Sequence, residues 1–414
     1  MKKYFMENRK RIGENMPNNS VLVLFAGNGA AERNFYYLTG TESLNIIFVL
    51  HKNGGNVRET LYLERFDELK AKWVGAPLSA EEAERLSGIE ACKEVDVFEN
   101  DVASILFASD CEVLLDLDAN EFDLPQTPAI KFANKIKAAF PAVKIQNAYK
   151  MFASARSVKS EYEIDCIKKA VDITCGGFGG MMKNARPGMF EYEIEAFFDF
   201  ELKKNGVREF AFPTIAASGV NATVLHYSAN KKKTKDGELI LIDAGAKFGG
   251  YSADITRTFP VNGRFSDRQK LLYSIVLEGQ KKVIEAIKPG VLFKSLNDVL
   301  IDFYRQELKK IELIRSDDEL GKYYYHKVSH LLGLETHDCG RVAESGAVLK
   351  TGMVLTVEPG LYVAEEEIGI RIEDDVVVTE SGCEVISAGI VKEIEDVEGL
   401  IDAREDFKEA KTEC

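Results

Sequence analysis

Three of the five histidines in this 414-residue sequence lie in one short segment, HKVSHLLGLETHD at 326–338. His326 and His330 are four residues apart, so on a helix they would share a face. Zinc proteases combine this spacing with a glutamate that directly follows the first histidine and acts as the base. Lys327 occupies that position here, and a protonated lysine neither binds a cation nor accepts a proton. A metal near this segment therefore needs other ligands.

The segment at 238–259 is a candidate β-hairpin, because two β-rich runs flank a Gly-Gly turn. With Phe248 and Gly249 as its loop, Asp243 faces Asp254 across the two strands. Directly opposed Cβ atoms lie about 4.5–5.5 Å apart, and facing like charges destabilise a sheet. We therefore expect a positive group between the two aspartates.

A second candidate hairpin, at 353–378, repeats this arrangement. Glu358 and Glu373 fall at corresponding places on its two arms, and alternation along the strand places Arg371 on the same face as Glu373. Asp243 and Glu358 each end a strongly apolar strand, and a buried ionised carboxylate needs a partner or a metal. Few lysines or arginines stand beside them, so a cation is the better explanation.

Four carboxylates and one imidazole suit two divalent ions better than a zinc-protease site. Four negative charges balance two M²⁺ ions and leave a shared position for water or hydroxide. Oxygen-rich ligation favours Mn²⁺, although affinity alone also admits Co²⁺, Fe²⁺ or Zn²⁺. Two ions about 3.5–4 Å apart lower the pKa of a bridging water and hold both the nucleophile and the attacked oxygen. The predicted chemistry is hydrolysis.

The elements that must position these residues divide the chain into two parts. Residues 1–155 alternate β-rich runs with helix-like segments, which predicts an N-terminal α/β domain, and no chemical motif lies in it. The predicted strands are at 21–27, 45–50, 59–64 and 111–118, and the predicted helices are at 79–88 and 127–140.

Residues 156–405 form the predicted second domain, followed by a tail at 406–414. Capping pairs begin two long helices, one at Ser160 and one at Ser266. Each helix runs to a Pro-Gly stop, and another helix follows each stop.

The two stops also indicate an internal duplication. Pro187 and Pro289 are 102 residues apart, and each helix pair is followed by a histidine-bearing segment and two β-rich runs. This layout predicts a pseudo-symmetric domain with a central sheet between helices.

Composition limits the partners and the compartment. The net charge of −14, from 53 basic and 67 acidic residues, argues against nucleic acid or an anionic membrane as the main partner. The seven cysteines are scattered, with no C-x-x-C pair, which indicates reduced thiols. The N-terminus is charged and the first apolar run is short, so no secretory or membrane segment is predicted. These features favour the cytoplasm.

The chain resembles the metallopeptidases of the pita-bread fold, specifically the branch of aminopeptidase P and prolidase, over nearly its whole length. The supporting segments are NFYYLTG (34–40), FPTIAASGVNATVLHY (212–227), DAGAKFGGYSADITRTF (243–259), HKVSHLLGLETHD (326–338), TVEPGLYV (356–363) and GIRIEDD (369–375). The resemblance implies an α/β protein, in which an N-terminal α/β domain precedes a pseudo-two-fold α+β pita-bread catalytic domain.

The resemblance also implies roles for individual residues. The two metals would be bound by Asp243, Asp254, His330, Glu358 and Glu373. The substrate site would be lined by His226, His326, His337 and Tyr362, and Arg371 would support it near Glu373. Glu358 would also relay protons, and His337 would donate hydrogen bonds to the tetrahedral intermediate. Lys327 departs from the glycine that the family usually has.

The implied activity is that of an Xaa-Pro aminopeptidase, with a bridging hydroxide attacking the carbonyl of the first peptide bond and with a homodimer or higher homo-oligomer as the assembly. A dipeptidase (prolidase) with the same centre is the nearest alternative. A metal-free relative that hydrolyses creatine and binding proteins related to histone chaperones are further alternatives, but both imply an incomplete ligand set.

Overall fold

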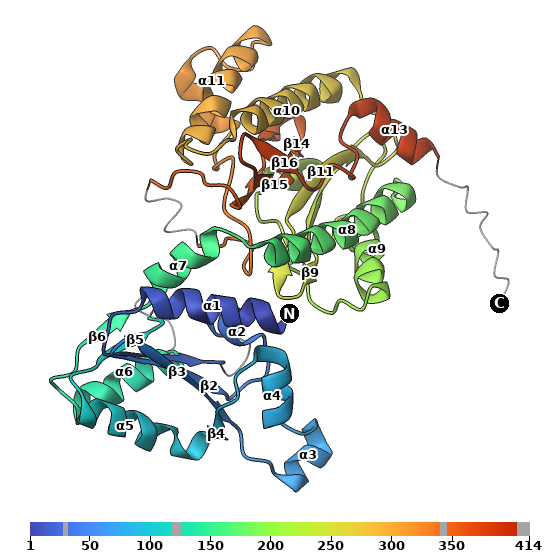
Figure 1. The fold of residues 1–414 in the computed structure, drawn as a ribbon. Helices are drawn as coiled ribbons and strands as arrows, with labels where there is room; N and C mark the ends of the chain where they lie inside the picture. The colour runs from blue at the N-terminus through green and yellow to red at the C-terminus, as the bar shows by residue number, and fades with distance from the viewer. Residues whose placement is uncertain (28–31, 118–125, 340–345, 404–414) are drawn as a thin grey trace, which may run out of the picture. The chain divides into compact units, whose positions relative to one another are not determined.

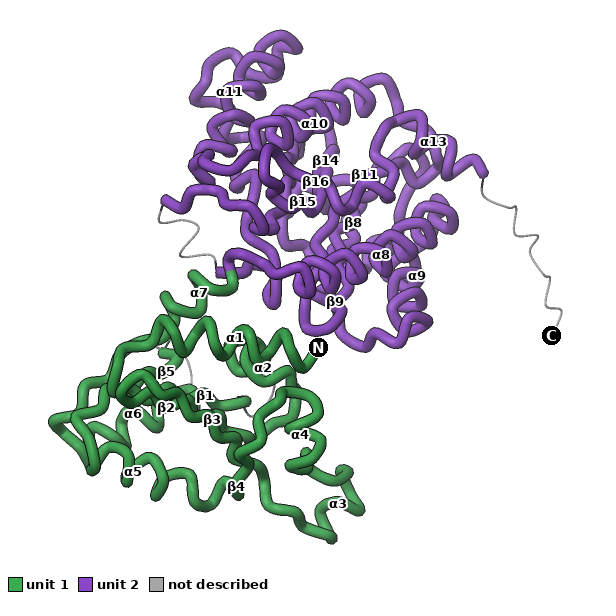
Figure 2. The backbone as a smooth tube through the Cα atoms, in the orientation of Figure 1, with its two compact units in different colours: residues 1–156 green, residues 157–414 purple. Residues whose placement is uncertain are grey.

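The computed structural model describes residues 1–27, 32–117, 126–339 and 346–403, and the predicted tail at 406–414 lies outside them. The chain divides into two compact units, Met1–Arg156 and Ser157–Cys414 (Figures 1 and 2). Within the described residues, no helix combines the length and the apolar character that crossing a membrane requires. Among the described cysteines, Cys92, Cys111, Cys166, Cys175 and Cys383 are free thiols.

The first unit is built on a mixed six-stranded sheet in the order β4-β3-β2-β1-β5-β6. Its strands are β1 (Ser20–Phe25), β2 (Ile47–Asn53), β3 (Asn56–Leu63), β4 (Cys92–Glu94), β5 (Glu112–Leu115) and β6 (Ile145–Asn147). Its helices are α1 (Lys2–Asn15), α2 (Arg33–Thr39), α3 (Glu68–Val74), α4 (Ala80–Ser87), α5 (Phe98–Ala108), α6 (Pro128–Ala139) and α7 (Tyr149–Ser157). The predicted strands and helices of this region are all present, with ends that shift by a few residues.

The second unit contains two helix pairs, as the duplicated layout predicts. Its helices are α8 (Glu161–Asn184), α9 (Glu191–Lys204), α10 (Asp267–Ala286), α11 (Ser295–Lys310) and α13 (Ile394–Asp402). Helix α8 packs against α9, and α10 packs against α11. Both predicted capping boxes form, at Ser160 and at Ser266. They satisfy backbone N–H groups that the first turn of each helix leaves without a helical partner.

Between these helices lie two hairpins that each divide into a base and a tip (Figure 1). The bases are three-stranded sheets, β11-β8-β7 and β12-β15-β16, and the tips are the ribbons β9-β10 and β13-β14. The strands are β7 (Ile215–Ser218), β8 (Leu239–Ala244), β9 (Lys247–Phe248), β10 (Tyr251–Ser252), β11 (Ile255–Pro260), β12 (Val354–Val357), β13 (Gly360–Val363), β14 (Ile368–Arg371), β15 (Asp374–Val378) and β16 (Cys383–Val385). The predicted central sheet is therefore interrupted, and three of the predicted metal ligands, Asp254, Glu358 and Glu373, lie at the interruptions.

Candidate metal centre

The first hairpin carries Asp243 and Asp254, but in a register that differs from the predicted one. Its loop is Gly249-Gly250, one residue later than predicted, and both glycines have positive φ, 57° and 83°. A two-residue hairpin loop with positive φ at both positions has the twist that matches its strands. Asp243 consequently pairs with Thr256, and the prediction that it faces Asp254 is wrong.

The observed register still places both aspartates on one face. This register sets Asp254 opposite Gly245, which is two positions along the strands from the pair of Asp243 and Thr256. A side chain at Gly245 would collide with the carbonyl of Ala253, so glycine permits the close approach of the two arms. Asp254 donates its N–H at 3.1 Å to a carboxylate oxygen of Asp375 in the other hairpin, and the ladder is interrupted at this residue.

The second hairpin has the register that the sequence predicts. Its base pairs Val357 with Asp374 and its tip pairs Gly360 with Arg371, and both pairings belong to one continuous register. This register places Glu358 opposite Glu373. The backbone N–H groups of the two glutamates donate to other segments. Glu358 donates to the carbonyl of Val328, and Glu373 donates to the carbonyl of Thr256. The arms are therefore not joined by their own backbone at the two glutamates.

The histidine segment at 326–338 is not helical. It runs beside β12, where the His330 carbonyl accepts from the N–H of Thr356 and the Val328 carbonyl accepts from that of Glu358. His330 Nε2 lies 3.2 Å from Asp254 Oδ2 and 3.6 Å from Glu358 Oε1. The side chains of Asp254, His330 and Glu373 each offer a ligand atom, and these atoms lie within 4.8 Å of one another. Three of the five predicted ligands thus form a compact set, with Glu358 beside it.

The fifth predicted ligand, Asp243, is held differently. Its Oδ2 accepts a hydrogen bond of 2.7 Å from Arg371 Nη2, whereas its Oδ1 is buried and has no hydrogen-bond partner among the described residues. A buried carboxylate oxygen without a donor is costly. A cation at the centre would supply the missing partner, so this oxygen fits a metal site.

The electrostatics of the carboxylates favour the same interpretation. Burial raises the pKa of Asp254, Glu358 and Glu373, and neighbouring carboxylates raise it further for Asp254 and Glu373. Arg371 opposes this effect for all three, and at Glu358 His330 opposes it more strongly than Arg371 does. Divalent ions reverse such shifts, because they favour the ionised form of every ligand around them. Five residues with four carboxylates therefore match two divalent ions in charge and in donor type.

Three further histidines of the second unit, His226, His326 and His337, interact with this set or with one another. His326 Nε2 lies 2.9 Å from the hydroxyl of Tyr362, and its Nδ1 lies 3.8 Å from Glu358 Oε2. The rings of His330 and His337 are 4.2 Å apart. Desolvation lowers the pKa of both His326 and His337 to about 4, which leaves them neutral near pH 7. The charge of His226, an exposed residue, contributes to both shifts and thus acts on both rings.

Arg371, in the second hairpin, donates hydrogen bonds to three side chains, two of which belong to the first hairpin. Its Nη1 donates to the hydroxyl of Tyr362 at 3.1 Å and its Nε donates to Thr256 Oγ1 at 3.1 Å, in addition to the bond with Asp243. Thr256 Oγ1 in turn donates to Glu373 Oε2 at 2.7 Å. One hydroxyl group therefore orients a predicted metal ligand and its supporting arginine together.

Thr256 and its counterpart Thr356 are site residues that sequence reasoning missed. The Oγ1 of Thr356 accepts a hydrogen bond of 3.2 Å from the His330 N–H and donates one of 3.4 Å to Glu358 Oε1. Each threonine is two residues from a predicted ligand, Asp254 or Glu358, that lies just beyond the end of its strand. Alternation along those strands was the available signal, since residues two apart share a face.

A buried carboxylate, Glu191, organises the loop that carries His226. It accepts five hydrogen bonds of 2.8–3.1 Å, from the N–H and hydroxyl of Ser218, the amide of Asn221, the hydroxyl of Tyr227 and the N–H of Lys232. Glu191 is fully buried. Such a fully satisfied carboxylate holds a loop in one conformation, and His226 directly precedes one of its donors. Sequence reasoning missed this residue as well.

The chain is similar to known metallopeptidases over nearly its whole length. Residues 165–380 match the metallopeptidase family M24, and residues 5–114 match the N-terminal domain of aminopeptidase P. An Xaa-Pro aminopeptidase from Haemophilus influenzae is 34% identical over 97% of both chains.

Solved structures are similar over the same length. A Bacillus anthracis protein that is proposed to be an aminopeptidase P is 43% identical, with a TM-score of 0.95 over 98% of this chain and 99% of its own. Aminopeptidase P from Escherichia coli with the inhibitor Pro-Leu is 30% identical, with a TM-score of 0.89 over the same shares. The family match covers more than half of the chain and includes every predicted ligand. The chain belongs to the metallopeptidase family M24.

Proposed function

We propose that this protein is a metal-dependent Xaa-Pro aminopeptidase, which removes the N-terminal residue from peptides with proline in the second position. The observation that carries the proposal is the buried set of Asp254, His330 and Glu373, whose ligand atoms lie within 4.8 Å of one another. The full-length similarity to proteins named for this activity supports the substrate class.

Five residues would hold two metal ions: Asp243, Asp254, His330, Glu358 and Glu373. When bound, two divalent ions polarise the attacked carbonyl and lower the pKa of the nucleophilic water. We propose Mn²⁺ because four of the five side chains offer oxygen, and the same set also admits Co²⁺, Fe²⁺ or Zn²⁺.

The protein groups around the ligands would move protons and stabilise charge. Glu358 would take a proton from the attacking water and pass it to the leaving nitrogen of proline. His337 is neutral near pH 7 because desolvation lowers its pKa to about 4. It would donate an N–H to the oxygen on which negative charge develops. His226 and His326 would line the same side of the substrate.

Tyr362 and Arg371 would support the substrate side of the centre. The hydroxyl of Tyr362 is fixed between His326 Nε2 and Arg371 Nη1, at 2.9 and 3.1 Å. Asp243 lies at the other end of the Arg371 guanidinium. We propose that the acidic end of the site near Asp243 attracts the free α-amino group of the substrate, which explains why a single residue is removed.

A dipeptidase with the same centre is the second candidate, because no residue described above closes the site against longer chains. Hydrolysis of Ala-Pro compared with that of a longer Ala-Pro peptide distinguishes the two. Lys327 is exposed at the site segment, where it would contact an acidic substrate end. A binding protein without activity is disfavoured by the complete ligand set. A homodimer or higher assembly and a cytoplasmic location stay predictions.

Two variants test the proposal, Glu358→Ala and His330→Ala, assayed on an Xaa-Pro peptide in Mn²⁺. Each removes one ligand, and we expect a loss of at least 100-fold in kcat/KM, because removing even a group that only orients a ligand through a hydrogen bond costs about 10–100-fold. His51→Ala, on β2 in the first unit, and Glu380→Ala, at an exposed residue, are the matched controls. Undiminished hydrolysis in either ligand variant would refute the scheme.

A further inference from the structure

The two glutamates of the second hairpin lie in a gap between its two ladders. The base ladder ends at the pair of Val357 and Asp374, and the tip ladder begins at the pair of Gly360 and Arg371. Glu358 and Glu373 send their N–H groups to other segments. Within this gap the arms are joined by one long backbone bond, 3.3 Å from the N–H of Ile372 to the carbonyl of Pro359. The separation of the two carboxylates therefore needs another constraint.

The side chain of Gln280, on α10, supplies that constraint. Its Nε2 donates to the carbonyl of Val357 at 3.0 Å and to that of Ile372 at 3.1 Å. Val357 directly precedes Glu358, and Ile372 directly precedes Glu373. The two N–H bonds of one amide group thus join the two arms at the positions before the ligands. Gln280 is fully buried, so water does not compete for either carbonyl.

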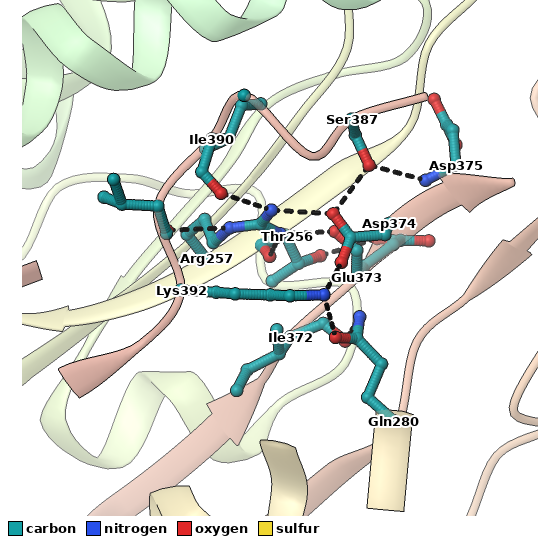
Figure 3. A network of polar contacts seen from close by, with 12 residues as sticks. Thr256, Arg257, Gln280, Ile372, Glu373, Asp374, Asp375, Ser387, Ile390 and Lys392 are labelled. Carbon is teal, nitrogen blue, oxygen red and sulfur yellow. Dashed lines mark hydrogen bonds and ion pairs between the residues drawn. The ribbon is translucent and has the colours of Figure 1, made fainter. Parts of the chain in front are cut away.

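A chain of charges, of which Asp374 and Arg257 are buried and Lys392 is partly buried, holds the amide in this orientation (Figure 3). Lys392 Nζ donates to Gln280 Oε1 at 2.8 Å and to Asp374 Oδ2 at 2.5 Å. Asp374 Oδ1 accepts from Arg257 Nη2 at 2.7 Å, and Arg257 Nη1 donates to the carbonyl of Glu373 at 2.5 Å. Since Lys392 donates to Oε1, the nitrogen of the amide must face the two carbonyls.

We infer that Gln280 is a positioning residue that sets the spacing of Glu358 and Glu373 and thereby the affinity of the centre for its metals. This inference rests on the proposed function, because it assigns the two glutamates as ligands. Metal sites accept ligand distances within about 0.2 Å of the ideal values, so a small change in the spacing of the arms weakens binding. Groups that orient ligands from behind typically contribute 10–100-fold in metal affinity.

The test is Gln280→Glu in the full-length protein, with Gln280→Met as a second variant. Glutamate has the shape of glutamine and keeps the contact with Lys392, but an ionised carboxylate cannot donate to either carbonyl. Methionine removes the donors without adding charge. Metal-free protein is titrated with Mn²⁺ in a calorimeter, and the melting temperature of the metal-free form is measured beside it. We expect the Kd for Mn²⁺ to rise 10–100-fold in both variants.

Gln269→Glu is the matched control. Gln269 lies on the same helix, is buried, and donates its Nε2 to the carbonyl of Gly237 at 2.9 Å, away from the centre. We expect the control to lower the melting temperature of the metal-free form but to leave the Kd for Mn²⁺ within twofold of the parent value. A role in stability alone would move all three variants in melting temperature and none in affinity.

The outcomes separate the inference from the function beneath it. If the parent protein binds two Mn²⁺ ions and Gln280→Glu or Gln280→Met binds them with unchanged Kd, the inference is wrong and the proposed function stands. If the parent protein binds no divalent ion, the proposed function fails first. If Gln280→Glu does not fold, the Kd of Gln280→Met decides, and added Mn²⁺ is expected to restore kcat in that variant.

Discussion

Replacing Thr256 by valine tests how strongly one hydroxyl group supports the centre. Thr256 is fully buried, and the substitution keeps its shape. It removes the acceptor of Arg371 Nε at 3.1 Å and the donor to Glu373 Oε2 at 2.7 Å. Hydrogen bonds to charged groups contribute about 1.5–3 kcal/mol each. One hydroxyl makes both bonds, and Arg371 keeps two other partners. We therefore expect the free energy of unfolding to fall by about 2–4 kcal/mol in total, less than the sum of two independent bonds.

Thr174→Val separates stability from function in this experiment. Thr174 is also fully buried, donates to the carbonyl of Ala170 at 2.8 Å and accepts from the N–H of Ala246 at 2.9 Å. Thr174→Val removes these two hydrogen bonds to neutral groups, which corresponds to a loss of about 1–3 kcal/mol in the free energy of unfolding. Urea unfolding measures both losses, and calorimetry with Mn²⁺ measures the affinity. We expect Thr256→Val alone to weaken metal binding, by roughly 10–100-fold. Equal metal affinity in the two variants would refute the role of Thr256.

Three further outcomes follow from the same contacts. Glu191→Gln replaces the carboxylate that accepts five hydrogen bonds. In steady-state kinetics we expect KM to rise about tenfold, which corresponds to the free energy of one hydrogen bond, while kcat stays nearly unchanged. An unchanged KM would show that the loop with His226 does not depend on Glu191. Lys159→Met removes the buried ion pair of 3.2 Å between Lys159 and Asp338, and urea unfolding should report a loss of about 3–5 kcal/mol in the free energy of unfolding, the range for breaking a buried pair from one side. The double variant Lys159→Met/Asp338→Asn should recover part of the lost free energy of unfolding. Chelation should lower the melting temperature, since metal at 100 times Kd stabilises by about 2.7 kcal/mol, and an unaltered melting curve would contradict a metal-stabilised fold.

The sequence predicts those parts of the site that depend on local patterns. The capping pairs at Ser160 and Ser266 place the long helices, because side-chain caps act over three residues. The register that sets Glu358 opposite Glu373 follows from corresponding positions on the two arms of one hairpin. Both predictions involve residues close together in the chain, where geometry has few alternatives.

The error in the first hairpin has a simple cause. Both Phe248-Gly249 and Gly249-Gly250 are plausible two-residue loops, and a shift of the loop by one residue moves the pairing by two. A shift of two keeps each side chain on its face, so Asp243 and Asp254 still share a face although they do not oppose each other.

Contacts between distant segments were not predictable from such patterns. Gln280 joins carbonyls that are 77 and 92 residues away, and Thr256 reaches Glu373 across 117 residues. Nothing in the local sequence distinguishes Gln280 from an ordinary buried glutamine on a helix. Similarly, the spacing of His326 and His330 indicates a helical face, whereas the segment runs beside β12 and is held there by backbone bonds to Thr356 and Glu358.

The position of bound Mn²⁺ tests the central claim most directly. We expect anomalous diffraction from crystals grown with Mn²⁺ to show two peaks about 3.5–4 Å apart, surrounded by the side chains of Asp243, Asp254, His330, Glu358 and Glu373. A single peak, or peaks that these side chains do not contact, would contradict the assignment of a dinuclear centre.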